Sequence, residues 1–102
     1  MREVSQAELE KVCREGHTFA LFVYTPLCGT CKLAKRMLTV VEAALPTARV
    51  YQLDVNLSVQ VAKHWQISSV PALLLFVGGE LKERHYALQS VGYLYDILRS
   101  MA

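Results

Sequence analysis

A chain of 102 residues has the size of one domain and can bury a core without disulfide or metal staples. Its 53% apolar and 20% charged residues are typical of a globular protein and exclude a disordered chain, a collagen and a disulfide-rich secreted scaffold. The formal charge of +2 comes from basic residues scattered among acidic ones, so it does not indicate nucleic acid or a membrane surface as a partner. We expect a single domain over residues 1–102.

The N-terminus and the cysteine count bear on the compartment. Residues 1–5 include an acid where a signal peptide would have an apolar stretch, and no run of eighteen apolar residues occurs. These features predict a cytoplasmic protein. Its three cysteines, at positions 13, 28 and 31, are odd in number and make a poor closed disulfide framework. In a reducing compartment, paired cysteines indicate metal or redox chemistry.

The first half of the chain predicts a helix, a buried strand and a second helix. Ser5 and Glu8 form the Ser-x-x-Glu signature of a capping box, which predicts a helix over 5–15. The unbroken apolar run 19–24 is typical of a central strand covered on both faces. Residues 29–45 place apolar side chains on one helical face and charged ones on the other, and the proline at position 46 ends this helix.

The middle of the chain predicts a strand and a short helix. Residues 50–55 mix β-forming and polar side chains, which favours a strand. Leu57, Val61 and Trp65 repeat at four-residue spacing, which predicts one apolar helix face. Trp65 is expected to pack in the core.

The last third predicts a β-hairpin and a final helix. The apolar run 72–77, the turn Gly78-Gly79 and the charged segment 80–86 predict a hairpin whose second arm is an exposed edge. Ser90 is a suitable cap for a helix with an apolar stripe. The order of elements is therefore α, β, α, β, α, β, β, α.

The segment Cys28-Gly29-Thr30-Cys31 falls where strand 19–24 passes into helix 29–45. The start of a helix leaves backbone N–H groups unpaired and presents the positive end of the helix dipole, and both stabilise a thiolate. We therefore expect the pKa of Cys28 to lie below that of a free thiol. Lys32 adds positive potential nearby, although a solvated helix lysine is the simpler interpretation.

The two cysteines are expected to have different roles. Cys28 precedes the helix and should be the exposed attacking thiol, whereas Cys31 lies one turn inside and faces inward. Cys28 would attack a substrate disulfide, and Cys31 would then attack Cys28 and release the reduced substrate. No cofactor beyond the redox-active Cys28–Cys31 disulfide is expected.

These residues resemble the thioredoxin family, because its features occur here in the family's order. A strand leads into Cys-Gly-x-Cys-Lys at 28–32, and a long helix, a strand and a short helix follow; Val70-Pro71 then precedes an apolar strand and a Gly-containing turn. The resemblance covers most of the chain. It implies an α/β thioredoxin fold with a mixed central sheet of about four strands flanked by helices, the N-terminal strand being short or missing.

The resemblance also implies a function and a substrate groove. It implies a thiol–disulfide oxidoreductase of intracellular redox homeostasis, acting on protein disulfides or mixed disulfides of small thiols, with electrons from a reductase or a thiol pool. In that family the proline matching Pro71 is cis and packs beside the cysteines, which leaves the backbone of Val70 able to pair with an extended substrate. We expect a monomer.

Four positions near the cysteines depart from the family's pattern. Leu27 stands where thioredoxins have a tryptophan, and Phe22 where they have a buried aspartate that helps proton transfer. Gln52 replaces the lysine partner of that aspartate. Thr30 replaces the usual proline and adds a hydroxyl and an N–H that can stabilise the Cys28 thiolate. We expect slower resolution of the mixed disulfide and a potential less reducing than the about −270 mV of thioredoxin.

Two other functions stay open at this point. Cys-x-x-Cys supplies half of a structural zinc site, which Cys13 and one histidine could complete only if the fold brought them together. A module that keeps the fold but binds partners without turnover is the second alternative. Cys13 itself lies on the apolar stripe of the first predicted helix, which is typical of a small buried hydrophobe rather than a regulatory thiol.

Overall fold

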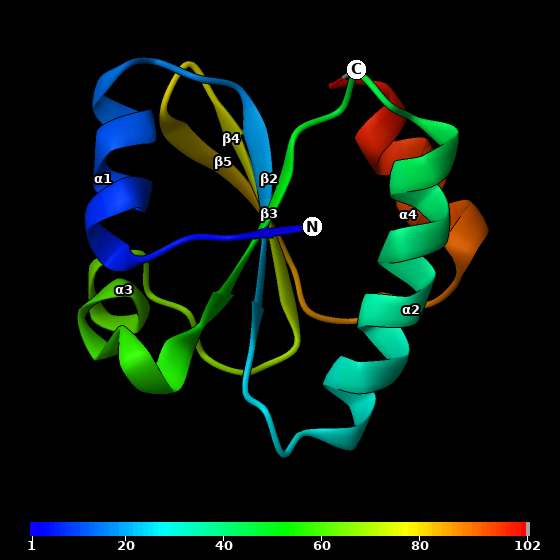
Figure 1. The fold of residues 1–102 in the computed structure, drawn as a ribbon, viewed down its shortest axis with the longest axis horizontal. Coiled ribbons are helices and arrows are strands. Elements are labelled where there is room, and N and C mark those ends of the chain that lie inside the picture. Colours follow the sequence, from blue (N-terminus) through cyan, green and yellow to red (C-terminus); the bar gives the residue numbers. More distant parts are fainter. Residues whose placement is uncertain (102) are drawn as a thin grey trace.

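The computed structural model describes residues 1–101 and contains a five-stranded mixed sheet with helices on both faces (Figure 1). The elements in chain order are β1 (Arg2–Glu3), α1 (Gln6–Arg14), β2 (Phe19–Tyr24), α2 (Gly29–Ala44), β3 (Val50–Asp54), a 3₁₀ turn η1 (Val55–Leu57), α3 (Val59–His64), β4 (Ala72–Val77), β5 (Glu80–His85) and α4 (Val91–Arg99). Helices α1 and α3 cover one face, and α2 and α4 cover the other (Figure 1). The α/β thioredoxin fold implied by the resemblance is confirmed.

The strand order, β1-β3-β2-β4-β5, determines which loops meet. β2 is the middle strand, as its apolar run predicted, and it pairs in parallel with β3 and antiparallel with β4. In the antiparallel pair Val23 lies opposite Ala72, so the end of β2 adjoins the start of β4. The loop that enters α2 and the loop that enters β4 therefore lie at the same end of the sheet.

The helices begin where their cap residues predict. The Ser5 hydroxyl accepts the Glu8 N–H at 3.2 Å while the Ser5 N–H donates to the Glu8 carboxylate at 3.1 Å, which completes the capping box of α1. The Ser90 hydroxyl accepts the Tyr93 N–H at 3.1 Å at the start of α4. Each cap satisfies an amide that has no partner within its helix.

One sequence-based expectation is sharpened and another needs correction. The sheet of about four expected strands has a fifth, because the N-terminal strand is present and short: Arg2 and Glu3 pair in parallel with Tyr51 and Gln52. Leu57 does not share an apolar helix face, since its side chain is 83% exposed. The reason is that it belongs to the separate 3₁₀ turn before α3, which breaks the expected four-residue period.

The expected core position of Trp65 is only partly correct. Trp65 is half-buried at the C-terminal end of α3, with its ring edge-on to Phe76 at 5.8 Å between centroids. The apolar side chains form two clusters, one on each face of the sheet, and Trp65 packs against the cluster on the α1 and α3 face. Within residues 1–101, no helix is both long and apolar enough to cross a membrane.

Candidate active site

Cys28 occupies the N-cap position of α2, where the backbone is still extended. Its sulfur accepts a hydrogen bond from the Cys31 N–H at 3.1 Å and lies 3.2 Å from the Thr30 hydroxyl oxygen. Cys28 is half-buried, so the sulfur combines helix-terminal contacts with access from solvent. This is the arrangement that the position of the motif in the sequence predicts.

The environment of Cys28 lowers the pKa of its thiol. The largest cause is hydrogen bonding from the Cys31 side chain, followed by hydrogen bonding from the Thr30 hydroxyl, and the backbone N–H groups of both residues act in the same direction. Burial opposes this shift. All of these donors favour the thiolate over the thiol. Cys28 is therefore the better nucleophile of the pair near neutral pH.

Cys31 has the opposite character. Its side chain is 2% exposed, and burial together with the neighbouring Cys28 raises the pKa of Cys31 to about 11, although the Thr25 backbone N–H favours its thiolate. Cys31 is thus protonated while it donates to Cys28. A half-buried, solvent-accessible thiol of lowered pKa beside a buried thiol of raised pKa can attack and resolve in sequence.

Val70 and Pro71 meet the cysteine loop at the end of the sheet. The Val70–Pro71 peptide bond is cis, which confirms the geometry implied by the resemblance. Pro71 and Thr30 line one cavity of about 290 Å³, which residues 86–89 also line. Within residues 1–101, no hydrogen bond involves the backbone N–H or C=O of Val70. The unpaired N–H and C=O of Val70 therefore directly precede Pro71, which lines this cavity.

Lys32 and Gly29 are sequence neighbours of the two cysteines. Lys32 is exposed and lines a second cavity, of about 220 Å³, together with Cys31. It is not among the groups that lower the pKa of Cys28, so the thiolate depends on Thr30 and Cys31 instead. Gly29 is the first residue of α2, and a Cβ there would meet no atom within 4 Å. The packing therefore does not require a glycine at this position.

Tyr24 and Glu3 lie close to the site, although no sequence motif predicted them. The Tyr24 hydroxyl donates to the Glu3 carboxylate at 2.7 Å, and burial, reinforced by this hydrogen bond, raises the pKa of Tyr24 to about 12. Tyr24 also lines the cavity that contains Cys31 and stacks on Phe22, with centroids 5.8 Å apart. One signal in the sequence could have indicated Tyr24: it lies two residues after Phe22 on the same strand, and residues two apart on a strand share a face of the sheet.

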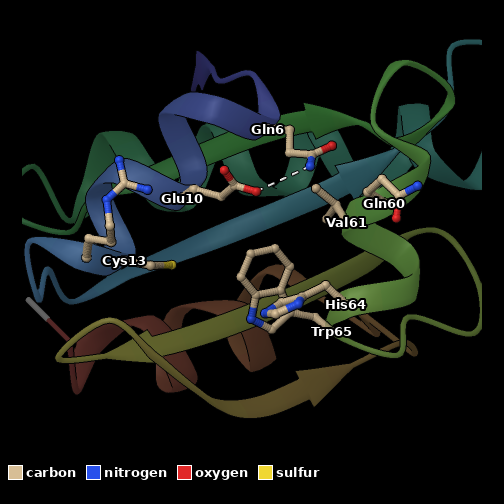
Figure 2. Close-up of a pocket in the computed structure, with 8 residues that line it drawn as sticks. Gln6, Glu10, Cys13, Gln60, Val61, His64 and Trp65 are labelled. Atoms are coloured by element: carbon tan, nitrogen blue, oxygen red, sulfur yellow. Dashed lines mark hydrogen bonds between the residues drawn. The ribbon is translucent and has the colours of Figure 1, made fainter.

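A larger cavity, of about 470 Å³, lies on the opposite face of the sheet between α1 and α3. Figure 2 shows the Cys13 sulfur pointing toward the Trp65 and His64 rings across this cavity. Burial, aided by Glu10, raises the pKa of Cys13. Cys13 is therefore a weak nucleophile at neutral pH, in contrast to Cys28.

The fold separates Cys13 from the reactive pair. Cys31 belongs to the cluster beneath α2, whereas Cys13 packs against the cluster on the other face. Within residues 1–101, no three histidine, cysteine, aspartate or glutamate side chains gather closely enough to hold a metal ion. Cys13 is thus not positioned to complete a zinc site with the Cys-x-x-Cys pair.

Comparison with known proteins places this geometry in a family. The thioredoxin family model matches residues 1–98. The chain is 48% identical to the thioredoxin-like protein YusE of Bacillus subtilis over 97% of this chain and 92% of the relative, and 32% identical to a thioredoxin of Chlamydia muridarum over 70% of each.

Solved structures agree with the sequence relatives. A point mutant of a thioredoxin from Halobacterium salinarum superimposes with a TM-score of 0.82 at 27% identity, covering 98% of this chain and 88% of that one. The thioredoxin of Fasciola hepatica has the same fold, with a TM-score of 0.86 at 18% identity over the whole of both chains. The matched sequence, the fold and the Cys-x-x-Cys pair together show that this chain belongs to the thioredoxin family of thiol–disulfide oxidoreductases.

Proposed function

We propose that this protein is a dithiol–disulfide oxidoreductase that reduces protein disulfides through Cys28 and Cys31. The observation that carries the proposal is the contrast between the two cysteines. The Cys28 thiol is solvent-accessible and has a lowered pKa, whereas the Cys31 thiol is buried and has a raised pKa. The Cys31 backbone N–H donates to the Cys28 sulfur at 3.1 Å. The Cys28 thiol is suited to attack a substrate disulfide, and the Cys31 thiol is suited to stay protonated until the mixed disulfide has formed. A structural pair would need no such difference.

The reaction has two exchange steps. The Cys28 thiolate attacks one sulfur of the substrate disulfide, forms a mixed disulfide and expels the other substrate sulfur as a thiolate. Cys31 then loses its proton to solvent and attacks the Cys28 sulfur, which forms the Cys28–Cys31 disulfide and releases the second substrate thiolate. Two electrons pass to the substrate, and a reductase or a thiol pool must return them.

The groove beside the cysteines supports an extended protein substrate. We propose that Pro71 forms one wall of the groove and that the unpaired N–H and C=O of Val70 pair with the substrate backbone. Leu27, beside the attacking thiol, is 95% exposed and offers an apolar contact for the same substrate. Main-chain pairing with apolar contacts favours proteins over small disulfides.

The environment of the thiolate supports a modest reducing power. Groups that stabilise the Cys28 thiolate stabilise the reduced protein, and therefore raise its reduction potential. We expect a potential less negative than the about −270 mV of thioredoxin.

We propose that the protein works as a monomer in the cytoplasm.

Reduction of insulin by dithiothreitol, followed as turbidity, tests the proposal. The protein should accelerate it and Cys28→Ser should abolish the acceleration, whereas pre-reduced Cys31→Ser mixed with insulin after removal of dithiothreitol should accumulate a mixed disulfide visible by mass spectrometry. Cys13→Ser is the matched control and should behave like the unaltered protein. If Cys28 is readily alkylated but no disulfide is reduced, the proposal is wrong and a binding module that retains the fold is favoured.

A further inference from the structure

Helix α2 separates two unlike surfaces beside Cys28. On one flank, the cavity of about 290 Å³ is lined by Thr30, Leu33 and Pro71 and by residues 86–89, among others, and its lining contains no charged side chain. A substrate segment that enters this flank meets only apolar and neutral polar groups. This flank therefore favours uncharged side chains.

The other flank of α2 is basic. A cavity of about 350 Å³ is lined by Lys32, Lys35, Arg36 and Thr39, and the smaller cavity that contains Cys31 shares Lys32 and Lys35 with it. All three basic side chains are exposed. Positive charge is thus concentrated on one side of the reactive pair, although the whole chain carries only +2.

The acidic side chains of this region have other partners. Glu42, the only acid on α2, pairs with the Met1 ammonium group at 3.1 Å. Glu3 accepts hydrogen bonds from the Tyr24 hydroxyl and from the Asp54 N–H. None of the ion pairs within residues 1–101 involves the three basic side chains of α2. Their charge is available to a partner.

We propose that the preferred substrates are proteins whose reactive disulfide lies between a short acidic segment and an uncharged apolar segment. This inference rests on the proposed function, because it assigns the substrate class of the same site. A chain bound across Cys28 contacts both flanks of α2 at once. The basic flank attracts the acidic segment, which speeds encounter and sets the orientation, and repels substrates with basic flanks.

The chemistry is the two-step exchange already described, so no further reactant is needed. The substrate disulfide gains two electrons and becomes two thiols, while Cys28 and Cys31 become a disulfide. Charge recognition acts on the first, bimolecular step, since resolution by Cys31 is intramolecular. The predicted effect is therefore on the second-order rate constant for substrate reduction.

Three synthetic peptides test the proposal. Each has one internal disulfide and one apolar flank, and they differ only in a second flank of three Asp, three Asn or three Lys residues. Pre-reduced protein is mixed with each peptide in a single turnover, and the reduced peptide is measured by chromatography after acid quench. We expect the Asp peptide to react about tenfold faster than the Lys peptide at an ionic strength of about 20 mM, and the difference to vanish near 1 M.

A pair of charge-matched variants locates the effect. Lys35→Gln/Arg36→Gln removes two charges from the basic flank and leaves Lys32, the neighbour of Cys31, in place. Lys11→Gln/Lys63→Gln removes two exposed charges from α1 and α3. The readout is the ratio of the Asp to the Asn rate, which cancels any change in thiol reactivity. We expect this ratio to fall about threefold or more in the first variant and to stay the same in the second.

Each outcome decides between the two proposals. Equal rates for the three peptides, or equal losses in both variants, would overturn the acidic-substrate inference and leave the oxidoreductase function standing. Reduction of no peptide, with Cys28 still open to alkylation, would overturn the oxidoreductase function itself. Oxidised glutathione that matched the Asp peptide in rate and in dependence on Lys35 and Arg36 would assign the basic flank to a small anionic disulfide, and would also overturn the inference.

Discussion

Phe22 and Gln52 lie directly opposite each other on the parallel strands β2 and β3, with side chains 0% and 8% exposed. The side-chain oxygen of Gln52 is buried and has no hydrogen-bond partner within residues 1–101. The two positions at which this chain lacks the aspartate and the lysine of the thioredoxin pattern are therefore neighbours in the structure. An aromatic ring and a neutral amide occupy them, so neither side leaves a buried charge unpaired.

The first prediction concerns the Gln52 amide. Gln52→Met keeps the length of the side chain and removes a buried acceptor without a partner, so it should stabilise the protein by about 1 kcal/mol. Urea unfolding monitored by circular dichroism measures the change. A destabilised Gln52→Met protein would mean that the amide makes a favourable interaction, for instance with an ordered water.

The second prediction concerns an Asp–Lys pair introduced at positions 22 and 52. Phe22→Asp should destabilise the fold by about 4 kcal/mol, because it removes a fully buried ring and introduces an unpaired acid. Phe22→Asp/Gln52→Lys should recover about 1 to 2 kcal/mol of this loss. Urea unfolding of both single variants and the double variant gives the coupling energy.

The double variant also tests why resolution should be slow. With an acid placed to accept the Cys31 proton, the mixed disulfide formed by Cys28 should resolve faster at pH 7 than in the unaltered protein. Quenched-flow trapping of the mixed disulfide measures that rate. An unchanged rate in a folded double variant would show that the missing acid does not limit resolution.

A third prediction concerns the Thr30 hydroxyl. This group lies 3.2 Å from the Cys28 sulfur and lowers the pKa of the Cys28 thiol, so Thr30→Val should raise that pKa. Alkylation of Cys28 by iodoacetamide across a pH series should then shift to higher pH. Thr39→Val is the matched control, because the Thr39 hydroxyl donates instead to the Lys35 carbonyl at 2.8 Å. A shift of equal size in both variants would contradict the assignment.

A fourth prediction separates the three thiols by pH. The pKa of Cys28 is lowered, while burial raises that of Cys13 and also that of Cys31, to about 11. As pH rises, Cys28 should therefore be alkylated first and the other two only in alkaline solution. Mass spectrometry of peptides from the reduced protein distinguishes the three sites. Reaction of Cys13 at or below the pH at which Cys28 reacts would contradict the inertness assigned to it.

Much of the fold could be predicted because its signals are local. The cap residues Ser5 and Ser90 and the apolar run of β2 act over a few residues, and the structure has the corresponding elements. Leu57 shows the limit of such reasoning. Its spacing fits a helix, but a 3₁₀ turn intervenes and leaves the side chain 83% exposed.

Some features of the site could likewise be predicted from the sequence, and others could not. By itself, the sequence determined that Cys28 lies at a helix start with Cys31 one turn inside, because that position depends only on neighbouring residues. Only the tertiary structure decided what surrounds the pair. Strand pairing across the sheet brings Pro71 beside Thr30 and sets Phe22 opposite Gln52. These contacts join residues far apart along the chain, and no local pattern specifies such contacts.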